Sequence, residues 1–124
     1  MYDINLTSSH FTAQNDAEIR DITIGALLRE VAAARPEAEA LVEVKQNGAE
    51  GRRWTYTELM QNAEKLAMAL STRFAPSERV VVWSPNGPEW VLLEYASALS
   101  GLVLVTANPA FQARELAYVL KQSS

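Results

Sequence analysis

The sequence predicts an α/β fold in which βαβ units build a parallel sheet, accompanied by a small β-hairpin. The first observation is that short apolar runs alternate with helical patterns over residues 80–120, the order expected of parallel strands joined by helices. The second is the dipeptide Asn47-Gly48, a frequent hairpin turn, which lies between strand-like runs at residues 40–44 and 52–56.

The first half of the chain predicts an arm followed by two amphipathic helices. Residues 1–22 are polar and aperiodic, which is typical of an N-terminal arm. Thr23 suits the N-cap of the first helix. Thr55 and Glu58 form a capping-box pattern at the start of the second, although Thr57 alone is an alternative cap. Apolar residues recur at helical spacing at positions 24, 27, 28, 31 and 32, and again at 59, 63, 66, 67, 70 and 74.

The second half predicts two buried strands and two helices. The predicted elements are a turn at 76–77, a strand at 80–83, a helix from 88 to 100, a strand at 102–105, a turn at 108–109 and a helix from about 113. Pro88 fits the first position of its helix, and Gly101 fits the position just after the helix ends. The first strand is apolar on both faces, as in the centre of a parallel sheet. We interpret Trp83 and Trp90 as core aromatics.

Composition excludes several classes of protein. The chain has 124 residues, 48% of them hydrophobic, so it can form a core. A net charge of −4 argues against a nucleic-acid partner, which favours a basic face. The absence of cysteine excludes disulfides and thiol nucleophiles. The N-terminus lacks a signal-peptide pattern and no apolar run could span a bilayer, so we expect no membrane span and a cytoplasmic location.

The motifs of common catalytic sites are absent from the sequence. There is no Walker phosphate loop, the five glycines never fall as G-x-G-x-x-G, and no serine lies in a G-x-S-x-G elbow. The single histidine, His10, lies in the polar arm and is best interpreted as a solvated loop residue. We therefore assign no catalytic residue and no metal ligand to this chain.

Three segments, taken together, resemble the N-terminal part of the adenylate-forming (AMP-binding) superfamily. They are RRWTYTELMQNAEKLAMAL at 52–70, ERVVVWSPNGPEWVLLEYASALSGLVLVTANP at 78–109 and FQARELAYVLKQSS at 111–124. The superfamily includes acyl-CoA synthetases, firefly luciferase and peptide-synthetase adenylation domains. The S-P-N-G-P-E-W and N-P motifs favour the acyl-CoA synthetases. Ser77 departs from the pattern, because the family usually has a turn glycine there.

The resemblance implies an ATP-dependent carboxylic acid–CoA ligase that forms an acyl-adenylate and then a thioester. It implies ATP, Mg²⁺ and CoA as cofactors, with the ATP and Mg²⁺ sites in later segments of the family. Residues 23–124 would be an incomplete N-terminal part of an AMP-binding domain, and the chain alone is predicted to be inactive. The segment that lies against the CoA nucleotide in acetyl-CoA synthetase corresponds to Asn108, Pro109 and Ala110.

Other interpretations stay open. Asn108 and Pro109 could simply form a turn, and so could residues 84–88. The chain could instead be a free-standing α/β module that binds a nucleotide or a partner without catalysis. An exposed sheet edge or apolar face could also drive self-association. The acid substrate could be a fatty acid or an aryl acid.

Overall fold

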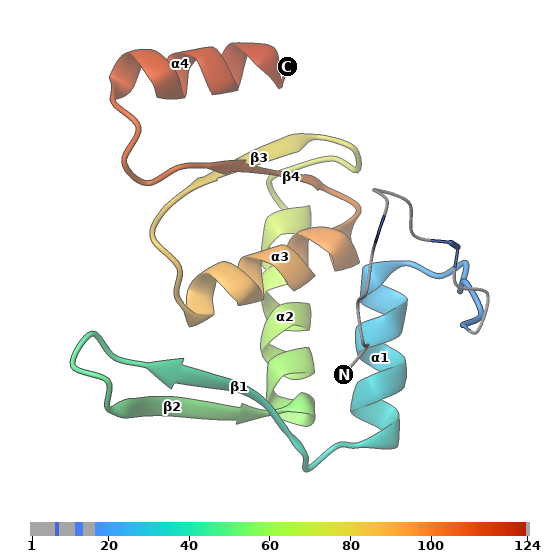
Figure 1. Ribbon diagram of the computed structural model, residues 1–124. Helices are drawn as coiled ribbons and strands as arrows, with labels where there is room; N and C mark the ends of the chain where they lie inside the picture. The colour runs from blue at the N-terminus through green and yellow to red at the C-terminus, as the bar shows by residue number, and fades with distance from the viewer. Residues whose placement is uncertain (1–6, 8–11, 14–16, 124) are drawn as a thin grey trace.

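A computed structural model of the chain describes residues 7, 12–13 and 17–123, so His10 and much of the predicted arm lie outside the described residues. Figure 1 shows the elements in order of the chain. They are α1 (Ile24–Ala34), β1 (Glu39–Val44), β2 (Glu50–Thr55), α2 (Tyr56–Ser71), β3 (Arg79–Trp83), α3 (Pro88–Ser100), β4 (Val103–Ala107) and α4 (Ala113–Gln122).

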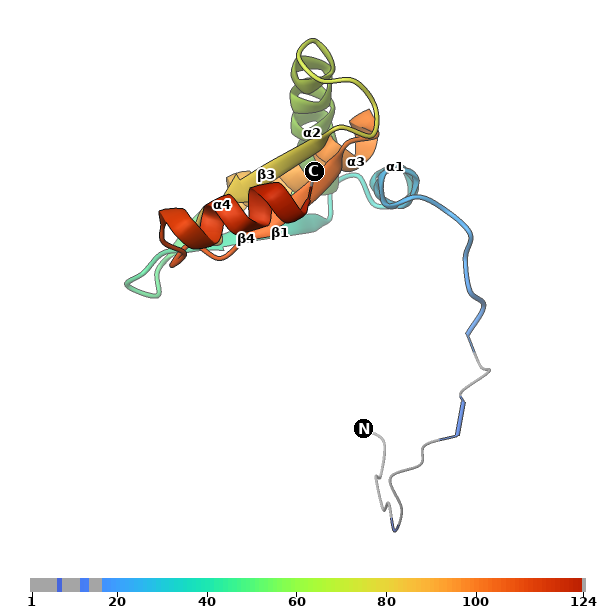
Figure 2. The same ribbon diagram turned by 90° about the horizontal axis from the view of Figure 1, so that it is seen from above.

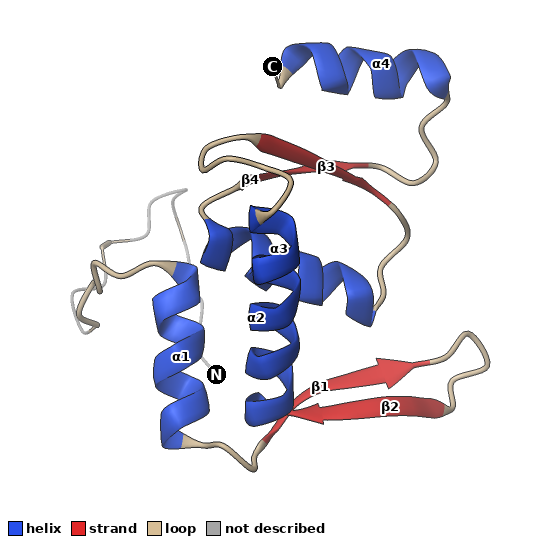
Figure 3. Cartoon of the chain, turned by 180° about the vertical axis from the view of Figure 1, so that it is seen from behind, coloured by secondary structure: helices blue, strands red, loops and turns tan. Residues whose placement is uncertain are grey.

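The strands form two separate sheets. β1 and β2 pair as an antiparallel hairpin, while β3 and β4 pair in parallel and are joined through α3. The predicted α/β class, with a βαβ unit and a hairpin, is therefore confirmed. Figure 3 shows the hairpin at one end of the molecule and the parallel sheet toward the other, with α3 between the two sheets and α4 beyond the parallel sheet.

The helix ends follow the predicted caps. The Thr23 hydroxyl accepts a hydrogen bond from Ala26 N at 3.1 Å. Thr55 and Glu58 form a complete capping box, which starts α2 at Tyr56 rather than leaving Tyr56 in the strand. α2 ends at Ser71, so Phe74, predicted to lie on its apolar stripe, lies beyond the helix and is 36% exposed.

Two residues have left-handed backbone conformations at connections between elements. Gly101 lies between α3 and β4, and Ser77 lies in the turn before β3. Gly101 ends α3 with φ 71°. Ser77 follows Pro76 in a turn that Glu78 N closes onto Ala75 O at 3.1 Å, and its own φ is also 71°. A left-handed conformation favours glycine, and at position 77 the residue is serine.

The core lies among the helices and the hairpin. Its buried cluster is Leu28, Leu59, Met60 and Ala63. α2 and α3 pack against each other most extensively, and Ala63 and Ala96 are fully buried. Small side chains at those positions let helices approach closely. Ser97, one residue after Ala96, is 1% exposed, and its hydroxyl has no hydrogen-bond partner among the described residues.

The parallel sheet is covered unevenly. α3 lies on one side of it and α4 on the other (Figures 1 and 2), yet none of the described residues of α4 is buried. Val103 on β4 is 45% exposed and Tyr118 on α4 is 66% exposed. The exposure of Val103 contradicts the expectation of a buried strand at 102–105, in which Leu102 is buried as predicted. Self-association through such surfaces stays a prediction. None of the described helices has the length and apolar character needed to cross a membrane.

Candidate functional site: a pocket at the carboxyl ends of the parallel strands

A pocket of about 600 Å³ lies where β3 and β4 end. In open α/β sheets, ligands bind beyond the carboxyl ends of the strands. The pocket is lined by Ser84, Pro85, Asn86, Trp90, Thr106, Ala107, Asn108 and Pro109. The two loops that follow these strands therefore form the walls of a single site.

The predicted residues Asn108, Pro109 and Ala110 form a tight turn at one wall. The Asn108 carbonyl oxygen accepts a hydrogen bond from Phe111 N at 3.0 Å, which closes the turn. The Asn108 side-chain oxygen Oδ1 accepts from Ala110 N at 2.9 Å. Proline in the second position presets the backbone angle of such a turn. Asn108 and Pro109 line the pocket, whereas Ala110 is not among its lining residues and supports the turn through its backbone N–H.

Trp83 is the residue of this site that the sequence did not identify. We expected a core aromatic, but Trp83 is 49% exposed, so that prediction is wrong. It is the last residue of β3, and its indole Nε1 donates to Asn108 O at 3.1 Å. The sequence shows four consecutive apolar residues, but it does not show which of their side chains lies at the exposed edge of the sheet. Trp90, the other predicted core aromatic, is half-buried and lines the pocket.

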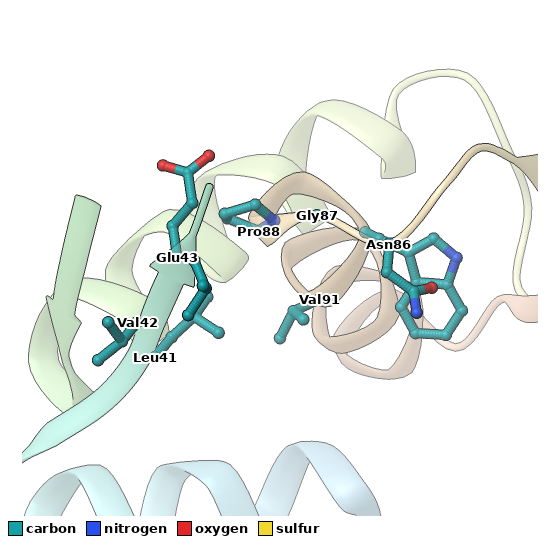
Figure 4. A pocket seen from close by; sticks show the side chains of 9 residues that line it. Leu41, Val42, Glu43, Asn86, Gly87, Pro88 and Val91 are labelled. Carbon is teal, nitrogen blue, oxygen red and sulfur yellow. The ribbon is translucent and has the colours of Figure 1, made fainter. Parts of the chain in front are cut away.

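A second pocket of about 540 Å³ lies on the other side of the loop that follows β3. It separates β1 from the N-terminus of α3. Its lining residues are Leu41, Val42, Glu43, Val44, Asn86, Gly87, Pro88, Trp90 and Val91. Figure 4 shows Leu41 on β1 and Val91 on α3 on facing sides of this space. Asn86 and Trp90 line both pockets, so the loop is the partition between them.

Arg52 on β2 ties the hairpin to α3 beside the second pocket. Its Nε lies 3.1 Å from Glu43 Oε2, and its Nη2 lies 2.6 Å from Glu89 Oε1. The guanidinium carbon also lies 5.0 Å from the centre of the Trp54 ring. Hydrogen bonds from Arg52 hold the pKa of both carboxyl groups below the ordinary value, and both carboxylates raise the pKa of Arg52. The two carboxylates beside the second pocket are thus already paired with Arg52.

The two pockets therefore differ in chemistry. None of the eight side chains lining the first pocket carries a charge, and they offer an indole face with two amides and two hydroxyls. Among residues 7, 12–13 and 17–123, no three His, Cys, Asp or Glu side chains are grouped so that they could hold a metal ion. The first pocket suits a flat, uncharged group.

The model of the family described as "AMP-binding enzyme" matches residues 28–124. This chain belongs to the AMP-binding enzyme family. The match begins inside α1 and includes both sheets, the two pockets and α4. The predicted family membership is confirmed.

The relatives of this chain include proteins named as an acyl-CoA ligase and an acyl-CoA synthetase. The human medium-chain acyl-CoA ligase ACSF2, a mitochondrial protein, is 41% identical over 101 residues, which are 81% of this chain and 16% of the relative. A fatty acyl CoA synthetase of Mycobacterium tuberculosis is 30% identical with a TM-score of 0.72, covering 82% of this chain and 20% of that one.

A solved N-terminal domain shows which part of the relatives this chain resembles. The N-terminal domain of FACL13 from Mycobacterium tuberculosis has a TM-score of 0.73 and is 31% identical, covering 82% of this chain and 25% of that one. This chain therefore corresponds to the N-terminal region of acyl-CoA ligases in the AMP-binding enzyme family. It spans about a sixth of the human ligase's length.

Proposed function

We propose that this chain is the N-terminal part of an AMP-forming carboxylic acid–CoA ligase, and that Asn108, Pro109 and Ala110 help to bind the nucleotide of CoA. The observation that carries the proposal is the uncharged pocket at the ends of two adjacent parallel strands, in a chain whose relatives are acyl-CoA ligases. Residues 23–124 would then belong to the ligase domain, with residues 1–22 as an arm before it.

The proposed ligase couples a small carboxylic acid to CoA in two steps. The carboxylate attacks the α-phosphorus of ATP with the help of Mg²⁺, giving an acyl-adenylate and pyrophosphate. The CoA thiol then attacks the acyl carbonyl and releases AMP. Stabilising the charge on the phosphoryl oxygens needs basic groups or a metal. The pocket beside Asn108 has no charged lining residue, so we assign it to the base of the CoA nucleotide and not to a phosphate group.

The chemistry of the pocket favours the base of the CoA nucleotide over its phosphates. The indole of Trp90 offers a flat apolar surface, and Asn86 and Asn108 offer amide groups that recognise ring nitrogens and exocyclic groups. Phosphates need cationic partners or free backbone N–H groups. Pro88 lacks an N–H at the start of α3, which weakens that helix end as an anion site.

Two compartments compete as the location of the protein. We keep a cytoplasmic location as a prediction, and the mitochondrial human relative makes the mitochondrion the competing compartment. Imaging of the tagged full-length protein would distinguish the two.

The test is a titration of the ¹⁵N-labelled chain with CoA, followed by two-dimensional NMR. We expect the backbone amides of Ser84, Asn86, Asn108 and Ala110 to shift on adding CoA or adenosine 3′,5′-bisphosphate, and not on adding pantetheine. Pantetheine shares the thiol arm of CoA but lacks the base. Shifts that are absent, or that pantetheine reproduces, would contradict the proposal.

A matched pair of variants sharpens the titration. Asn108→Ala removes the side-chain acceptor for Ala110 N, and Asn47→Ala removes an equivalent acceptor for Ala49 N, at 3.0 Å, in the hairpin turn. We expect only Asn108→Ala to weaken CoA binding. In a separate assay of thioester formation with ATP, CoA and a panel of acids, we expect no turnover by the chain alone. Robust turnover would show that its residues suffice for catalysis.

A further inference from the structure

Trp83 lies at the point where the two walls of the pocket meet. It pairs with Ala107 as the last step of the parallel register between β3 and β4. Its main chain continues directly into Ser84, Pro85 and Asn86, which form one wall. Its side chain reaches the turn that forms the other wall. One residue therefore connects the two loops that a bound ligand would touch.

The hydrogen bonds of the turn fall into two kinds. The bonds from Phe111 N to Asn108 O and from Ala110 N to Asn108 Oδ1 lie inside the turn and fix its shape. The bond from Trp83 Nε1 to Asn108 O, at 3.1 Å, comes from β3 and fixes where the turn lies relative to the sheet. The Asn108 carbonyl thus accepts both a closing bond and an anchoring bond.

The exposure of Trp83 supports a role outside the core. A tryptophan that is 49% exposed leaves much of its apolar surface in water. Tryptophan has a single polar group, the indole N–H, which can only donate. In Trp83 this group is used on a backbone carbonyl of the loop across the pocket. Phenylalanine keeps the aromatic ring there but offers no donor.

We propose that Trp83 is a positioning residue, whose indole N–H holds the Asn108 turn at the distance from residues 84–86 that the CoA base requires. This inference rests on the proposed CoA site. Without the bond, the turn keeps its shape but shifts relative to the opposite wall. A ligand that contacts both walls then loses part of its fit, while the parallel register below the pocket stays in place.

The test compares CoA binding by the chain and by two tryptophan variants. Trp83→Phe removes the donor, and Trp54→Phe makes the same chemical change on β2, outside the pocket. Because one net hydrogen bond is involved, we expect Trp83→Phe to raise the dissociation constant for CoA about 2- to 10-fold. We expect Trp54→Phe to leave it unchanged.

The indole N–H signals provide a readout that a purely structural role would not move. In the unsubstituted chain, we expect hydrogen exchange at Trp83 Nε1 to be slower than at Trp54 Nε1, and slower still when CoA is bound. This measurement needs no variant, so it also decides the matter if Trp83→Phe fails to fold. Exchange at Trp83 Nε1 that CoA leaves unaltered, whether fast or slow, would overturn the inference.

The outcomes separate this inference from the function on which it rests. If CoA shifts no amide of residues 84–86 or 108–110 in the unsubstituted chain, the CoA site itself is refuted, and the role of Trp83 falls with it. If CoA binds there and Trp83→Phe binds it equally well, the CoA site stands and the positioning role of Trp83 is refuted.

Discussion

Replacing Ser97 with alanine should stabilise the protein. The Ser97 side chain is 1% exposed in α3, and its hydroxyl has no hydrogen-bond partner among the described residues. A buried hydroxyl that makes no hydrogen bond costs about 1–3 kcal/mol relative to its hydrated state. Alanine removes that cost and also has the higher helix propensity, by a few tenths of a kcal/mol. The lost packing of one oxygen atom offsets part of the gain.

We expect a net increase in the free energy of unfolding of about 1–2 kcal/mol. For a chain of this size, that corresponds to a rise in Tm of roughly 4–8 °C. Urea unfolding followed by far-UV circular dichroism gives the free energy, and a constant m-value shows that the unfolded state is unaltered. Thermal scans give the Tm independently.

Ser100→Ala is the matched control in the same helix. The Ser100 hydroxyl donates to Ala96 O at 2.7 Å, so alanine removes a satisfied bond there and should be neutral or slightly destabilising. The reasoning is refuted if Ser97→Ala is no more stable than the unsubstituted chain, or if the two variants behave alike.

Three other predictions concern caps, turns and charge. Thr55→Ala removes the capping box of α2 and should cost about 1 kcal/mol in urea unfolding; an unchanged midpoint would contradict this. Ser77→Gly should raise stability by about 0.5–1 kcal/mol, because relief of the left-handed backbone exceeds the added freedom of the unfolded chain, and a lower Tm would argue against it. In Arg52→Gln, Glu43 and Glu89 lose the partner that depresses their pKa. A carboxyl group with a lowered pKa in the folded state stabilises the protein above pH 4.5, its ordinary pKa, and this stabilisation is lost as the pH falls through the lower folded pKa. The difference in unfolding free energy between Arg52→Gln and the unsubstituted chain should therefore be largest near pH 7 and shrink below pH 4.5. A difference that does not depend on pH would refute the assignment.

Much of the local structure could be predicted because its signals are local. The capping box at Thr55 lies within four consecutive residues, and Pro88 and Gly101 mark the two ends of α3 directly. The turn at Asn108 is likewise readable from an asparagine followed by a proline. Such features depend on neighbours in sequence, which the printed chain shows.

The assembly of the site could not be predicted, because it depends on register between distant segments. That Trp83 lies opposite Ala107 follows from the pairing of β3 and β4, and only this pairing brings the two loops to one pocket. The bond between Arg52 and Glu89 joins residues 37 positions apart, and nothing in either local pattern selects the other. The outward position of Trp83 also depends on the strand's neighbours.

The close packing of α2 against α3 has a consequence for the order in which the molecule assembles. Ala63 on α2 and Ala96 on α3 are fully buried. The two helices pack against each other more extensively than any other pair of elements, and β3 is the one element between them in the chain. Their docking closes the segment of residues 72–87, so it buries apolar surface at a modest entropic cost. Folding should begin there, and α4, none of whose described residues is fully buried, should join last and open first.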